Sequence, residues 1–214
     1  MLTVHAAPLV LPVGAAAVHD GAVAVDGDRI AAIGVYDAVV EAFPLARVRR
    51  WPGVITPGLR QRHAGPLLIS VYHPDPREAP ELGTEPIGGS ALEALEIDET
   101  RWAGSVRRGI ARMLAHGTTA VAGDFPAPVR TAVRRSGLTV VPAPPADRIP
   151  AGGPGLDPFV AGADLAGTVN GPLEAGGRAD LAAFDAPDEA ALVARGAGCC
   201  VATVVGGRLV HRAR

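Results

Sequence analysis

The sequence has 214 residues, a formal net charge of −2 at pH 7 and 48% hydrophobic residues, enough apolar material for one large or two small domains. The near-zero charge favours neither a nucleic acid nor a membrane as partner, and no run reaches the roughly 20 apolar residues that cross a bilayer. No basic region precedes the apolar N-terminus, so we expect a cytoplasmic protein rather than a secreted one.

The N-terminal part of the chain reads as short strands. Residues 2–5 and 9–13 are predicted as two strands separated by a proline-containing link. The clearest hairpin runs from Val18 to Val25 and from Arg29 to Ile33, because the intervening Asp26-Gly27-Asp28 is a hairpin turn sequence. A short helix at 36–43 and a strand at 47–51 are predicted next.

The middle of the chain alternates between helix and strand. Ile69–His73 is predicted as a strand, and Pro74–Gly89, rich in Pro, Gly and Glu, as a long loop. Asp98 has the character of a helix N-cap, and apolar residues follow at helical spacing on one face: Trp102, Val106, Ile110, Met113 and Leu114. A strand at 118–122, a helix at 129–136 ended by Gly137 and a strand at 138–141 complete a parallel α/β fragment.

The C-terminal part repeats the strand-and-turn pattern of the beginning. A glycine turn at 176–177 leads into a short apolar strand that ends near Asp185, and a second strand at 202–205 is followed by the Gly206-Gly207 turn and residues 208–211. Hairpins at opposite ends of one chain indicate a small sheet domain closed by both termini.

Two stretches carry a resemblance to a known family. Gly171–Asp185 closely resembles the C-terminal signature of the amidohydrolase superfamily, especially its imidazolonepropionase-like and cytosine-deaminase-like members. The unit made of the predicted helix, His116-Gly117-Thr118-Thr119 and a strand resembles a second motif of these enzymes. The resemblance implies a mixed α/β fold, in which N- and C-terminal segments form a composite β-sandwich beside a barrel. The implied domains are 1–55 with 167–214 for the sandwich, 56–145 for a partial β/α barrel remnant and 146–166 for a linker.

The segment left for the barrel is short. A complete (β/α)8 barrel takes about 250 residues, so the chain resembles a truncated member that lacks most of the metal-binding barrel. No His occurs between His116 and His211, the part of the chain where the family carries further metal ligands. An incomplete barrel is expected to leave two strand edges unpaired.

Candidate site residues follow from the same resemblance. His63 matches the first position of the family's His-x-His metal motif, but the second position is Gly65, and Arg60 and Arg62 bring positive charge to the same run. His63 is therefore the predicted metal ligand, and Asp124 and Asp164 are the candidate catalytic carboxylates. Alternative roles are a turn residue for Asp124 and a connection residue for Asp164. For the two other histidines considered, His73 and His116, a loop position and helix-end packing are the alternatives to metal binding.

The resemblance implies hydrolysis of non-peptide carbon–nitrogen bonds, as in deaminases and imidazolonepropionases, with weak or no metal-dependent activity in this chain. The expected substrate is a small aminated heterocycle. No cofactor is expected, and Zn or Fe only where the family site survives. The alternative is a non-catalytic subunit or scaffold that pairs with another chain, so a homo- or hetero-oligomer is expected.

Overall fold

The computed structural model describes residues 2–143, 155–159 and 163–213. These residues form two compact units, of which the first comprises Met1–Arg60, Leu114–Thr119 and Asp157–Arg214. The second comprises Gln61–Met113 and Ala120–Leu156. Most of the predicted linker at 146–166 lies outside the described residues.

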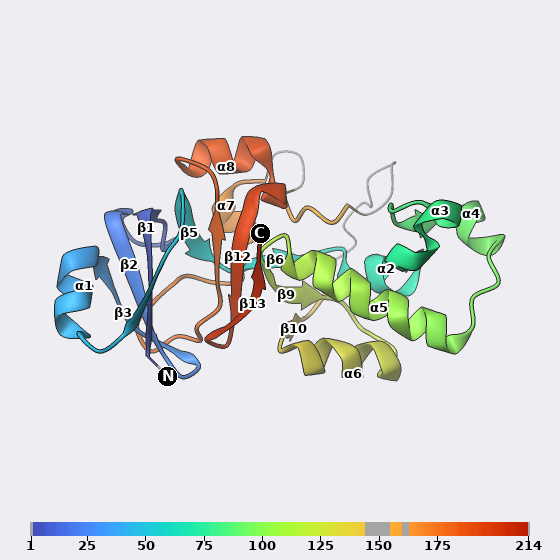
Figure 1. The fold of residues 1–214 in the computed structure, drawn as a ribbon, viewed down its shortest axis with the longest axis horizontal. Coiled ribbons are helices and arrows are strands. Elements are labelled where there is room, and N and C mark those ends of the chain that lie inside the picture. The colour runs from blue at the N-terminus through green and yellow to red at the C-terminus, as the bar shows by residue number, and fades with distance from the viewer. Residues whose placement is uncertain (1, 144–154, 160–162, 214) are drawn as a thin grey trace. The chain divides into compact units, whose positions relative to one another are not determined.

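The first unit is built around one mixed sheet that contains strands from both ends of the chain (Figure 1). Its strand order is β13-β12-β11-β5-β1-β2-β3, and β4 also pairs with β1. The strands are β1 (Thr3–Val10), β2 (Val18–Asp26), β3 (Arg29–Val35), β4 (Arg47–Arg50), β5 (Val54–Pro57), β11 (Leu181–Phe184), β12 (Cys200–Val205) and β13 (Arg208–Arg212). The central position of β5, between β1 and β11, joins the N-terminal strands to the C-terminal ones.

The first strand differs from the prediction of two strands around a proline. β1 is continuous through Pro8, which is exposed, and the ladder with β2 pairs Ala7 and Leu9 but skips Pro8. On its other side, β1 pairs with β4 up to Ala6 and with β5 from Leu9 onward. The proline therefore lies where β1 changes partner, and its missing N–H removes no ladder hydrogen bond there.

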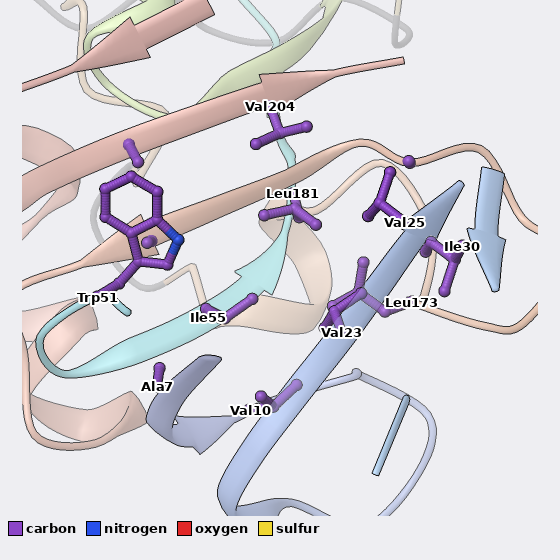
Figure 2. Packing of buried hydrophobic residues seen from close by; sticks show 13 residues of the cluster. Ala7, Val10, Val23, Val25, Ile30, Trp51, Ile55, Leu173, Leu181 and Val204 are labelled. Carbon is purple, nitrogen blue, oxygen red and sulfur yellow. The ribbon is translucent and has the colours of Figure 1, made fainter. Parts of the chain in front are cut away.

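The turns of two distant hairpins meet and close this unit. The Ala179 N–H donates to Asp28 O at 2.8 Å, and the Gly207 N–H donates to Ala179 O at 2.9 Å. Behind these turns, valines of β2 pack in one buried cluster with residues of β11 and β12, which are not their neighbours in the sheet (Figure 2). Val23, Leu181 and Val204 are each 0% exposed in this cluster, as expected for the interior of a sheet that curves around its own core.

Helices cover the outer faces of the same sheet. A second buried cluster joins Val54 and Phe184 to α7 (Leu165–Thr168) and α8 (Glu189–Arg195), through Leu165 and Leu192. The helix α1 (Tyr36–Ala42) covers β1 and β2 through Val39. The sequence pattern predicted α1 but not α8.

A smaller sheet has the order β10-β9-β6. Its strands are β6 (Leu59–Gln61), β9 (Thr118–Ala122) and β10 (Thr139–Val141), and β9 and β10 are parallel. The connection between β9 and β10 is α6 (Ala127–Ser136), which Gly137 ends in the left-handed conformation at φ 85°. β9 follows α5 (Glu99–Leu114), whose first turn is capped by Asp98 through a 2.7 Å bond from the Arg101 N–H.

The outer side of β6 is engaged, contrary to the expectation of two unpaired edges. Leu59 forms an antiparallel bridge with Val169, and the Asn170 N–H donates to Gly58 O at 3.1 Å. The segment that precedes the C-terminal signature thus occupies this position beside β6.

Part of the region predicted as strand and loop is more structured than expected. The predicted strand at 69–73 is the helix α2 (Ala64–Ile69) followed by the short strand β7 (Val71–Tyr72). Within the predicted loop at 74–89 lie the 3-10 helix η1 (Pro76–Glu78), α3 (Ala79–Leu82) and β8 (Ile87–Gly88), which pairs with β7. The helix α4 (Gly89–Glu93) follows. Local capping by Asp75 organises the start of this region.

The fold class is confirmed as mixed α/β, with a sheet from both chain ends and a small sheet that contains a parallel βαβ unit. None of the helices in the described part of the chain combines the length and apolar character needed to cross a bilayer.

Candidate functional site

His63, the predicted metal ligand, is held at the start of α2. It is the N-cap residue of this helix and is 7% exposed. The Gln61 side chain holds the backbone just before α2 in place. Its Oε1 accepts from the His63 N–H at 3.0 Å, and its Nε2 donates to the carbonyls of Gly155 and Leu156. The His63 Nε2 atom is buried and has no hydrogen-bond partner among the described residues. This nitrogen is the feature of the site best suited to take up a ligand.

The second position of the family motif differs in conformation as well as in residue type. Gly65 lies in the first turn of α2 rather than in a strand. A Cβ atom built at Gly65 meets no heavy atom within 4 Å. The space beside the backbone is therefore open, but no side chain from this position reaches into it.

The two candidate carboxylates have structural roles. The Asp124 side chain is fully exposed and pairs with Arg130, with 3.4 Å between Oδ1 and Nη2. Asp164 is the N-cap of α7, and its Oδ1 accepts from the Gly167 N–H at 2.7 Å. Each of the two carboxylates therefore has a local partner in the described part of the chain.

His73 and His116 lie in different surroundings. His73 is 0% exposed, its Nε2 is 2.9 Å from Leu67 O, and its backbone N–H donates to Ser105 Oγ at 2.8 Å. Burial holds the pKa of His73 below its ordinary value. Gly109 of α5 makes room for the ring, since a Cβ there would lie 2.7 Å from the His73 Nε2. His116 lies in the turn after α5, where it was predicted. His73 lies in the connection between β7 and η1, as its loop alternative predicted, but its ring is packed inside a core.

The residues present do not fit a catalytic zinc or iron ion. Such a site takes three protein ligands and an open position. Across residues 2–143, 155–159 and 163–213, no three His, Cys, Asp or Glu side chains are grouped so that they could hold a metal. His63 offers one nitrogen, and Gly65 offers none.

A charged cluster that the sequence analysis missed is centred on Glu78. Its carboxylate accepts from Tyr72 Oη at 2.8 Å, from the Asp75 N–H at 2.7 Å and from Arg101 Nη2 at 2.8 Å. Arg108 pairs with Asp75 at 3.1 Å. The Asp75 N–H and these side-chain donors hold the pKa of Glu78 at about 2. The spacing Asp75-Pro76-Arg77-Glu78 is a capping-box pattern, so this cluster had a sequence signal.

Replacing Glu78 with Gln is expected to lower the free energy of unfolding by about 2 kcal/mol, because charge-assisted hydrogen bonds are lost. The lowered pKa means that this contribution is present above about pH 4.5 and is lost as the pH falls toward 2. Urea unfolding of the variant measures the loss at neutral pH. The matched control is Glu81→Gln, an exposed position expected to change stability by less than about 0.5 kcal/mol. Equal effects of the two variants would contradict the prediction.

A pocket of about 470 Å³ lies in the first unit, between β1, β2, α1 and the end of β4. Arg50 and Tyr36 line it, and the Arg50 guanidinium lies 4.0 Å from the Tyr36 ring centroid. None of the predicted site residues lines this pocket.

Comparison with known proteins gives one family and several solved structures. A family model for the imidazolonepropionase-like composite domain of bacteria matches residues 21–46, and no curated protein matches the sequence. Aspergillus niger ochratoxinase is similar over 65% of this chain and 30% of its own, at 18% identity and a TM-score of 0.45. Helicobacter pylori aminofutalosine deaminase covers 65% of this chain and 32% of its own, at 17% identity and a TM-score of 0.43. Bradyrhizobium japonicum guanine deaminase covers 69% and 36%, at 17% identity and a TM-score of 0.41.

This chain therefore spans about a third of the length of these solved structures. The family match covers most of β2, all of β3 and α1 and the approach to β4, which form one side of the sheet shared by both chain ends. Over residues 21–46, the chain is similar to the imidazolonepropionase-like composite domain of the amidohydrolase superfamily.

Proposed function

We propose that this chain is an amidohydrolase-like protein whose class of chemistry is the hydrolysis of non-peptide carbon–nitrogen bonds, of the deaminase or imidazolonepropionase kind. We propose further that the chain by itself has weak or no metal-dependent activity. The match of residues 21–46 to the composite-domain family carries the first part. The expected substrate remains a small aminated heterocycle.

The surroundings of His63 support the second part of the proposal. A single imidazole nitrogen binds zinc weakly compared with a set of three ligands. Asp124 and Asp164 already serve an exposed ion pair and a helix cap.

Metal analysis and an ammonia-release assay on the purified chain test this proposal together. After incubation with Zn²⁺ and buffer exchange, we expect far less than one ion per chain and no release of ammonia from cytosine or guanine above the buffer rate. His63→Ala should behave like the unaltered protein in both measurements. One tightly held ion per chain that is lost in His63→Ala, together with turnover, would overturn the proposal.

The alternative is a non-catalytic subunit that pairs with another chain. What favours it is the position of β10 at the end of the small sheet, where the Val140 side chain is 42% exposed. A strand edge with an exposed apolar residue invites pairing with a further strand. Under this alternative, Val140→Arg should shift an assembly toward monomer in light scattering coupled to size exclusion.

A further inference from the structure

Three arginines gather at one place on the first unit, and we call them the arginine patch. Arg47 and Arg49 alternate along β4 and therefore share a face, opposite Thr3 and His5 of β1. Arg212 lies at the end of β13, and its guanidinium is 5.8 Å from the centroid of the Trp51 ring. Trp51 in turn stacks on His5. The two edge strands β4 and β13 thus bring their cations to one aromatic pair.

The patch brings together like charges, and none of its three arginines forms an ion pair with a carboxylate in the described ranges. Burial, followed by the charges of Arg47 and Arg212, lowers the pKa of Arg49. Like charges held together are unfavourable unless an anion joins them. Arg47 and Arg212 are exposed, so an anion from outside can reach the patch.

The same chain carries a stretch of the opposite charge, which we call the acidic segment, residues 75–99. It contains one basic residue, Arg77, and eight acidic residues: Asp75, Glu78, Glu81, Glu85, Glu93, Glu96, Asp98 and Glu99. Asp75 and Glu78 are already paired with Arg108 and Arg101. Four others are exposed and form no ion pair within the described ranges: Glu81, Glu85, Glu93 and Glu96.

We propose that the arginine patch binds the acidic segment of a second copy of this chain. Guanidinium groups bind carboxylates in a bidentate manner, so the chemistry of the two surfaces is complementary. A two-fold arrangement makes the contact twice, because the patch of each copy then meets the acidic segment of the other. The net charge of −2 adds little repulsion between copies. This interaction does not depend on the proposed catalytic class.

A competing explanation for the arginines is protection of the edge strands β4 and β13 against pairing. It predicts a monomer whose arginines can be replaced only at the risk of aggregation. A dimer held by the patch behaves differently, because exposed ion pairs weaken as the Debye length shrinks from about 30 Å at 0.01 M salt to about 3 Å at 1 M.

Light scattering coupled to size exclusion gives the first test. The unaltered chain should elute at about twice its mass of 21.7 kDa at low salt and as a monomer at high salt. A monomer at low salt overturns the proposal, and so does a dimer that persists at high salt, as pairing through β10 would predict.

Charge reversal gives the second test. Arg47→Glu with Arg49→Glu should be monomeric at low salt, and so should Glu93→Arg with Glu96→Arg. An equimolar mixture of the two variants should form dimers again, because the reversed residues of one variant then face reversed residues of opposite charge in the other. Failure of the mixture to associate, with both variants folded by circular dichroism, overturns the proposal.

A matched control separates the position of the charges from their number. Arg107→Glu with Arg134→Glu alters the net charge by the same amount as reversal of Arg47 and Arg49, at exposed positions on α5 and α6. This control should remain a salt-sensitive dimer. A control that dissociates as fully as the patch variant would show that net charge, not the patch, governs association.

Discussion

Lowering the pH from 7 to about 4 is expected to cost the protein about 3 kcal/mol of stability through one buried residue, His5. Burial, followed by the charge of Arg49, lowers the pKa of His5 to about 4 from an ordinary value of 6.5. In the unfolded chain the imidazole takes up a proton near pH 6.5, whereas in the folded protein it does so only near pH 4. Stability is therefore complete above about pH 6.5 and falls as the pH decreases through this window.

The hydrogen bond between His5 and Trp51 explains why the neutral form is selected. The Trp51 Nε1–H donates to the His5 Nδ1 at 3.1 Å, so this ring nitrogen acts as an acceptor and must carry no proton. Protonation would place two donors against each other and add a buried charge near Arg49. His5 is 2% exposed, so water cannot compensate for either effect.

Urea unfolding at several pH values measures this contribution. His5→Asn should be less stable than the unaltered protein at pH 7, but its loss between about pH 6.5 and 4 should be smaller by about 3 kcal/mol. Glu78 contributes little to the loss of stability between pH 6.5 and 4, because its own contribution to stability is lost only below about pH 4.5. His19→Asn, at an exposed position on β2, is the control and should keep the full pH dependence. If the free energy of unfolding of His5→Asn depended on pH as strongly as that of the unaltered protein, His5 would not be the source of this pH dependence.

The hairpins were predictable because turn chemistry and strand pattern agree locally. Asp26-Gly27-Asp28 and Gly206-Gly207 both mark turns in the structure, and both glycines of the latter have positive φ. That the chain ends share one sheet also followed from the family resemblance. The sequence did not predict that β1 continues through Pro8, because the proline is tolerated only where β1 changes its partner from β4 to β5.

The region between Pro74 and Gly89 was harder to predict, because its order depends on side chains far along the chain. Glu78 draws together Tyr72, Asp75 and Arg101, and the contribution of Arg101 comes from α5. The capping-box spacing indicates the contact between Asp75 and Glu78, but nothing in the sequence pattern points to Arg101. Similarly, the burial of His73 depends on Ser105 and Gly109, and neither residue has a sequence signal for this role.

The candidate site was also only partly predictable from the sequence. The family resemblance places His63 on a ligand position, and its ring Nε2 has no hydrogen-bond partner among the residues that the structure describes. What the motif could not show is that Gly65 lies in a helical turn. The roles of Asp124 and Asp164 likewise depend on Arg130 and on the Gly167 N–H, which become neighbours only after local folding.

Gly207→Ala is expected to destabilise the composite sheet by about 3 kcal/mol or more, because backbone strain and a clash add together. Gly207 has φ 72°, a conformation that L side chains rarely adopt. A Cβ there would lie 1.8 Å from Gly27 O, a backbone atom of the opposing hairpin turn. The two turns would have to separate, and the hydrogen bond from the Gly207 N–H to Ala179 O would be strained or lost.

Gly27→Ala is the matched control, because it lies in the partner turn with φ 59° but a Cβ there meets no heavy atom within 4 Å. Gly27→Ala should lower the free energy of unfolding by only about 1 kcal/mol, the cost of holding an alanine in the left-handed backbone conformation. Chemical denaturation of both variants measures the difference, and amide exchange on β2, β3, β12 and β13 should show where the sheet opens. Because the clash joins residues near opposite ends of the chain, Gly207→Ala should speed exchange in both hairpins, whereas Gly27→Ala should affect its own hairpin more. Equal losses in the two variants would mean that the turns do not hold each other as closely as the structure places them.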